Sequence, residues 1–146
     1  MNTDIQIVLV EDNEDDAALT MRAMKDVNLI NEITWLKDGE KAVDYLLAQG
    51  NYSQRDQSKK PKLILLDLKL PKLNGTEVLQ IIKENEELSQ IPIVVMTSSK
   101  EDKDLQKCYE LGVNSYVVKP INFSQFLKVT KEISMYWILT NQTPKK

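Results

Sequence analysis

The sequence predicts an α/β domain, with a parallel β-sheet that is covered by helices on both faces. Short apolar runs that favour strands alternate along the chain with longer segments in which apolar residues recur at helical spacing. Four of the five predicted strands also end on a charged or hydroxyl side chain. Functional groups collect at such carboxyl ends in open parallel sheets, and 146 residues are enough for one domain with its own core.

The N-terminal part begins with a predicted strand over residues 5–10, which are mostly apolar and β-branched. Residues 14–27 then place apolar side chains at steps of three and four, as an amphipathic helix does. Three acids at residues 14–16 fall in the first turn of this helix, where the helix dipole favours negative charge. Residues 32–36 are predicted to form a short second strand.

Asp38 is the expected N-cap of a second helix over residues 40–49, which carries an apolar stripe. Gly50 is placed to end this helix, because glycine adopts the left-handed backbone conformation with little strain. Residues 51–60 are polar and lack periodicity, so they are predicted to form an exposed loop.

The central predicted strand covers residues 63–66, four apolar residues that suit burial on both faces. It runs into Asp67, and Pro71 ends the extended segment soon afterwards. Turn-forming residues follow, and a third helix is predicted over residues 76–85.

The C-terminal part contains two more predicted strands, over residues 91–96 and 115–118. Ser99 should begin the helix between them in the manner of a capping box, and Gly112 should end it. A last helix is predicted over about residues 122–140, and its end is apolar almost all round.

The composition of the chain argues against several classes of protein function. The net charge of −3 gives no electrostatic footprint for nucleic acid or for an anionic membrane surface, and no apolar run is long enough to span a bilayer. The N-terminus lacks a signal-peptide pattern, and a single cysteine, Cys108, suits a reducing compartment. We therefore expect a cytoplasmic protein. The chain has no histidine, which excludes histidine-based triads and zinc–histidine sites.

The polar residues at the strand ends form a candidate site. They are Glu11 and Asp12 after the first strand, Asp67 after the third, Thr97 after the fourth and Lys119 after the fifth. Three carboxylates on one edge repel one another, so they need a cation, which Lys119 or a divalent ion could supply. Oxygen ligands without histidine suit Mg²⁺ or Mn²⁺. Because an aspartate can attack a phosphoryl group and form an acyl phosphate, the pattern is consistent with phosphoryl transfer to Asp67.

With these residues in this order, the sequence resembles the receiver domain of two-component response regulators over about residues 5–138. The resemblance implies a doubly wound, flavodoxin-like parallel sheet of five strands in the order 2-1-3-4-5. It implies a single domain over residues 1–146, with a C-terminal helix extension and tail at about residues 135–146. It also implies a phospho-acceptor signalling protein and not an enzyme, apart from slow loss of its own phosphate.

The resemblance assigns a role to each acid of the candidate site. Asp67 would accept the phosphoryl group from a histidine kinase. Asp12, Asp67 and the backbone carbonyl of Lys69 would hold Mg²⁺ (or Mn²⁺), and Glu11 would assist through water.

The remaining strand-end residues would respond to the phosphate. Lys119, whose bond to the following proline would be cis, would pair with the phosphoryl oxygens. Thr97 would move toward the phosphate and Tyr116 would turn inward behind it, which would reshape the surface of the fourth helix, fifth strand and fifth helix. From the residues alone, Tyr116 also suits a packed strand position, and Ser98 or Ser99 could share the role of Thr97.

The chain further resembles the single-domain receivers that are paired with cyanobacterial and bacterial phytochromes. The acidic opening at residues 11–16, the polar loop at residues 51–60 and the aromatic C-terminal segment support this narrower resemblance. It makes a phytochrome the candidate histidine kinase.

The C-terminal helix predicts an interface, because its large apolar residues exceed what one sheet face needs and such surface usually marks contact with another protein. We predict a homodimer through the fourth helix, fifth strand and fifth helix, to which the C-terminal segment adds. The predicted interface residues are Phe126, Ile133, Tyr136, Trp137 and Leu139.

Three other functions stay open. A phosphatase or phosphotransferase with an aspartyl-phosphate intermediate usually needs a second carboxylate two residues after the nucleophile, where this chain has Lys69. A flavin-binding module would need a phosphate-binding loop after the first strand, where residues 11–14 are largely acidic. A receiver that no longer takes phosphate would act as an adaptor, although the set of site residues is complete.

Overall fold

The computed structural model describes residues 6–25 and 32–120, together with residues 122, 124, 125, 128 and 132. Its centre is a five-stranded sheet in which all neighbouring strands are parallel and the order is β2-β1-β3-β4-β5. The strands are β1 (Gln6–Val10), β2 (Glu32–Leu36), β3 (Leu63–Leu66), β4 (Ile93–Thr97) and β5 (Ser115–Val118). The predicted fold class and strand order are confirmed.

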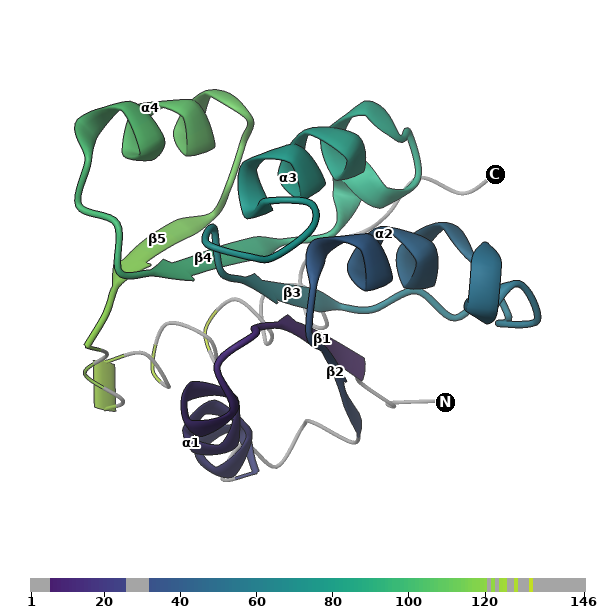
Figure 1. The fold of residues 1–146 in the computed structure, drawn as a ribbon, viewed down its shortest axis with the longest axis horizontal. Helices are drawn as coiled ribbons and strands as arrows, with labels where there is room; N and C mark the ends of the chain where they lie inside the picture. Colours follow the sequence, from purple (N-terminus) through teal and green to yellow (C-terminus); the bar gives the residue numbers. More distant parts are fainter. Residues whose placement is uncertain are drawn as a thin grey trace.

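Helices cover both faces of this sheet (Figure 1). They are α1 (Glu14–Met24), α2 (Gly39–Leu47), α3 (Gly75–Glu84) and α4 (Asp102–Glu110), with short 3₁₀ turns η1 (Gly50–Tyr52) and η2 (Leu88–Gln90). Helix α1 lies on one face, and α2, α3 and α4 lie on the other. The first four predicted helices are therefore present, with ends that differ by a few residues.

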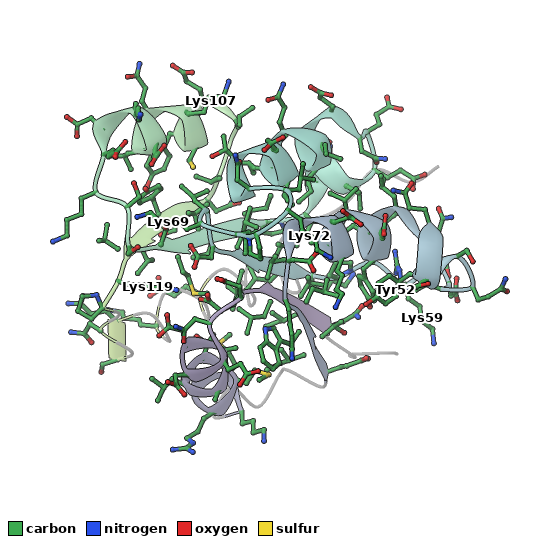
Figure 2. The ribbon with its side chains drawn as sticks, in the orientation of Figure 1. Tyr52, Lys59, Lys69, Lys72, Lys107 and Lys119 are labelled. Carbon is green, nitrogen blue, oxygen red and sulfur yellow. The ribbon has the colours of Figure 1, made fainter. Side chains whose placement is uncertain are left out.

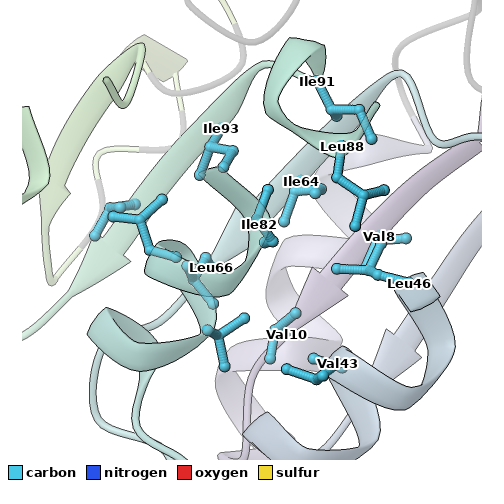
Figure 3. Close-up of a cluster of buried hydrophobic side chains, with 14 of the residues drawn as sticks. Val8, Val10, Val43, Leu46, Ile64, Leu66, Ile82, Leu88, Ile91 and Ile93 are labelled. Carbon is cyan, nitrogen blue, oxygen red and sulfur yellow. The ribbon is translucent and has the colours of Figure 1, made fainter. Parts of the chain in front are cut away.

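The central strands bury both faces because successive side chains point to opposite sides of a sheet. In β1, Val8 and Val10 pack with the α2 and α3 side chains shown in Figure 3, whereas Ile7 and Leu9 pack on the α1 side. All four residues of β3 are fully buried in the same alternating manner. The apolar run at residues 63–66 was thus correctly interpreted as a strand covered on both faces.

Two predicted helix ends were wrong. Helix α2 ends at Leu47 and is capped by Ala48, which takes the left-handed conformation with φ 53°, and Gly50 instead begins η1. The side chain of Arg55 donates hydrogen bonds to the carbonyls of Tyr45 and Leu46, so the last turn of α2 is satisfied without a glycine cap.

Ser99 is not the N-cap of α4. Glu101 holds that position, and the hydroxyl of Ser99 instead donates to the Asp104 carboxylate. Gly112 follows α4 with φ 89°, as predicted for the residue that ends the helix.

The predicted last helix falls mostly outside the described residues, among which Ser124, Gln125, Lys128 and Glu132 are helical. The five predicted interface residues, Phe126, Ile133, Tyr136, Trp137 and Leu139, all lie outside the described part of the chain. Within that part, no helix is both long enough and apolar enough to cross a membrane.

Candidate functional site

The site is assembled by backbone pairing that continues one residue beyond the strands. The amides of Glu11, Asp67 and Lys119 each donate to the carbonyl of the last residue of a neighbouring strand, at 3.0, 3.0 and 2.8 Å. These bonds fix all three residues at the carboxyl edge of the sheet. The positions of these three residues therefore follow from the strand register.

Three carboxylates meet at this edge. Glu11, Asp12 and Asp67 each offer an oxygen atom, and these atoms lie within 4.8 Å of one another. Glu11 and Asp67 are buried, whereas Asp12 is exposed. Close, partly buried carboxylate oxygens without nitrogen or sulfur ligands fit a hard divalent cation such as Mg²⁺ or Mn²⁺.

Lys119 supplies the positive charge among these acids. Its Nζ atom donates to Glu11 Oε1 at 2.6 Å, to Asp16 Oδ2 at 2.8 Å and to Asp67 Oδ2 at 3.0 Å. Figure 2 shows Lys119 near the end of β5, beside α1. Burial by itself lowers the pKa of this ammonium, but the three carboxylates together raise it above its ordinary value, so Lys119 stays charged.

Both the side chain and the main chain of Glu11 accept hydrogen bonds. Its Oε2 accepts from the Asn13 amide at 3.2 Å, and its backbone carbonyl accepts from Trp35 Nε1 at 2.7 Å. Burial raises the pKa of the Glu11 carboxyl to about 7, with the Asp67 charge adding to the rise and Lys119 opposing it. The raised pKa of Lys119 and the raised pKa of Glu11 are compatible. Several carboxylates share one ammonium, so Lys119 keeps its proton while one carboxyl, Glu11, takes up a proton more easily than usual.

Asp67 is fixed by the loop that follows it. Its Oδ1 accepts from the backbone amide of Lys69 at 3.1 Å, and Gly75 donates its amide to the Leu68 carbonyl at 2.8 Å. A Cβ atom on Gly75 would lie only 2.2 Å from the Asp67 carbonyl oxygen, so this close approach of α3 requires glycine. Asn74 begins α3 with a full capping box, which fixes the end of the loop.

Thr97 and Tyr116 both contact Ser99. The buried Thr97 hydroxyl accepts from the Ser99 amide at 3.3 Å, and the half-buried Tyr116 donates its hydroxyl to the Ser99 carbonyl at 3.0 Å. Ser98, by contrast, is exposed. The loop between β4 and α4 therefore links the strand-end hydroxyl to the aromatic ring on β5.

A cavity of about 400 Å³ opens next to the carboxylates. It is lined by Asp12 and Lys69 on the side of the site and by Pro71, Asn74 and Asp104 from the surrounding loops and helices. This opening leaves the Asp12 side of the site accessible from outside.

The structure brings together Glu11, Asp12, Asp67 and Lys119, whereas the hydroxyl of Thr97 contacts the Ser99 amide. The Lys119–Pro120 bond is cis, as the resemblance implied. The sequence analysis missed Asp16, which it treated only as a partner of the helix dipole. The sequence carried no local signal for this contact, because it joins the first turn of α1 to the residue that follows β5.

The family described as the response regulator receiver domain matches residues 7–131. The chain is 44% identical to the probable methanogenesis regulatory protein FilR2 of Methanothrix harundinacea, over 94% of this chain and 86% of that protein. It is 41% identical to the response regulator Rcp1 of Synechocystis sp., over 94% and 92%.

Solved structures agree with these relatives. The phosphorylated cyanobacterial phytochrome response regulator RcpA superimposes with a TM-score of 0.80 at 38% identity, covering 97% of this chain and 99% of that one. The Mn²⁺-bound form of Rcp1 superimposes with a TM-score of 0.78 at 39% identity and the same coverage. The chain belongs to the response regulator receiver domain family of two-component signalling and is similar to phytochrome response regulators.

Proposed function

We propose that this protein accepts a phosphoryl group on Asp67 from the phosphohistidine of a histidine kinase. The observation that carries the proposal is the convergence of three carboxylates with the Lys119 ammonium at one edge of the sheet. Such a site can neutralise the charge of an incoming phosphoryl group beside a nucleophilic carboxylate.

The transfer is a displacement at phosphorus. An Asp67 carboxylate oxygen forms a bond to phosphorus while the phosphorus–nitrogen bond of the phosphohistidine breaks. The electron pair of the broken bond stays on the imidazole nitrogen of the kinase, which then takes up a proton. Lys119, already hydrogen-bonded to Asp67 at 3.0 Å, is placed to bind a phosphoryl oxygen.

Asp12 and Asp67, with the Lys69 carbonyl and with Glu11 through water, would hold Mg²⁺ or Mn²⁺. The bound ion would supply positive charge to the phosphoryl oxygens. The Mn²⁺-bound form of the relative Rcp1 supports this assignment. Slow hydrolysis of the acyl phosphate would return the protein to its resting state.

The phosphate would be sensed through Thr97 and Tyr116, which would alter the surface of α4, β5 and the helix that follows. The similarity to RcpA makes a phytochrome the candidate kinase. We place the protein in the cytoplasm, as one domain over residues 1–146 that signals by dimerisation or by docking to a partner protein.

The test is the intact mass of the protein after incubation with Mg²⁺ and acetyl phosphate. Wild type should gain one phosphoryl group, which hydroxylamine removes because it cleaves acyl phosphates. Asp67→Asn should gain none, whereas Asp56→Asn, which alters an exposed acid in the loop before β3, should behave as wild type. If wild type gains no phosphoryl group from acetyl phosphate or from a phosphorylated kinase, the proposal is contradicted and a non-phosphorylated adaptor is favoured.

A further inference from the structure

Asp16 takes part in the ion-pair network of the site, yet the proposed metal binding and phosphoryl transfer assign it no role. Its carboxylate belongs to the first turn of α1 and contacts Lys119 Nζ at 2.8 Å. We propose that Asp16 competes with the incoming phosphoryl group for Lys119 and thereby limits how tightly the site takes up phosphate. This inference rests on the proposed role of Asp67 as phospho-acceptor.

The competition follows from the number of donors on Lys119. An ammonium group has three N–H donors, and in this structure three carboxylates accept from it. While Asp67 still accepts from Lys119, an incoming phosphoryl oxygen can therefore bind Lys119 fully only when Glu11 or Asp16 withdraws.

Asp16 is the carboxylate that can withdraw at the lowest cost. Its side chain is 40% exposed, whereas those of Glu11 and Asp67 are 1% and 6% exposed. An exposed carboxylate exchanges its ion pair for water, but a buried one would be left as an unpaired charge.

The backbone of Asp16 can stay in place while its side chain leaves Lys119. The Asp16 amide donates to the side chain of Asn13 at 2.9 Å, and its carbonyl accepts from the Thr20 hydroxyl at 2.8 Å. Neither bond involves the Asp16 carboxylate. A change of side-chain rotamer is therefore sufficient to free the third donor of Lys119.

Removing the Asp16 charge should strengthen binding of phosphoryl-like ligands. A partly exposed ion pair contributes little, so we expect an increase of about threefold to fivefold in affinity. A decrease in affinity would mean that Asp16 positions Lys119 for the ligand instead of competing with it.

The experiment titrates Mg²⁺-loaded protein with beryllofluoride, which mimics a phosphoryl group on a carboxylate. Asp16→Asn removes the charge, and Asp16→Glu retains it and should behave as wild type. Asp15→Asn is the matched control, because Asp15 is the adjacent exposed acid and forms no ion pair within the described part of the chain. NMR of the Lys119 ammonium protons without ligand gives a second readout, since their exchange with water should accelerate in Asp16→Asn alone.

Tighter beryllofluoride binding by Asp16→Asn than by Asp15→Asn is the expected result. Equal or weaker binding by Asp16→Asn, while wild type and Asp15→Asn bind normally, would overturn this inference and leave the role of Asp67 intact. If no variant binds beryllofluoride, the proposed function fails together with the inference.

Discussion

The Glu11 carboxyl titrates differently from an ordinary glutamate because the fold buries it beside a cation and a second acid. Its pKa of about 7 lies above the ordinary value of 4.5, so the folded state keeps a proton that the unfolded chain loses between these pH values. In metal-free protein this contribution to the free energy of unfolding is fully present below about pH 4.5. It is lost as the pH rises through about 7.

We therefore predict that, in EDTA, wild type loses stability relative to Glu11→Gln as the pH rises from about 5 to about 8. Mg²⁺ should reverse this trend for wild type, because metal ligands bind in their deprotonated form. Urea denaturation at each pH measures both effects. Glu40→Gln, which changes an exposed carboxyl on α2, is the control, and a difference between Glu11→Gln and wild type that does not vary with pH would contradict the prediction.

Helix α3 approaches β3 so closely that its first residue must be glycine. A Cβ at position 75 would lie 2.2 Å from the Asp67 carbonyl oxygen and 2.4 Å from the Leu68 Cα, and neither backbone atom can move without shifting the strand end. We predict that Gly75→Ala destabilises the fold by about 1–3 kcal/mol, as overpacking does, although alanine favours helices. It should also weaken Mg²⁺ binding, because Asp67 would be displaced.

Urea denaturation and a Mg²⁺ titration measure the two effects of Gly75→Ala. Thr76→Ala, which alters the next residue of the same helical turn, should leave Mg²⁺ binding close to that of wild type. A Gly75→Ala protein as stable as wild type would show that α3 is free to shift away from β3.

Elements that depend on local pattern were predicted well, and contacts between distant segments were not. The run at residues 63–66 placed Asp67 at a strand end because strand periodicity is local. The loop at residues 51–60 is mostly exposed, as predicted, but the sequence did not reveal that its Arg55 lies over the Tyr45 ring at 4.5 Å and binds the end of α2. The pairing of Asp16 with Lys119 likewise joins residues 103 positions apart, which no local pattern reveals.

At the scale of the whole molecule, the ends of β1, β3 and β5 and the first turn of α1 bring one cation and four carboxylates to a single edge, so the site depends on the register of the sheet. The strand order places β1 and β3 side by side at the centre, which brings Glu11 next to Asp67. Lys119 reaches both from β5, which lies two strands away from β3. The residues could therefore be chosen from the sequence, but their contacts required the three-dimensional arrangement.

The face of the molecule formed by α4 is only partly packed. Within the described residues, Cys108 is the one fully buried side chain of α4, and Leu105 and Tyr109 are 37% and 51% exposed. This exposed apolar surface supports the predicted homodimer through α4, β5 and the C-terminal helix. Analytical ultracentrifugation should show a dimer at a concentration on the order of tens of micromolar.

The variant Tyr109→Asp should weaken this dimer by roughly tenfold or more, because a charge would enter an apolar contact and exposed tyrosines often dominate interfaces. Leu19→Asp is the matched control, since Leu19 is similarly exposed at 48% but lies on α1, across the sheet. A monomer at these concentrations, whether phosphorylated or not, would rule out the dimer. A dimer that tolerates Tyr109→Asp but not Leu19→Asp would instead place the interface on the α1 face.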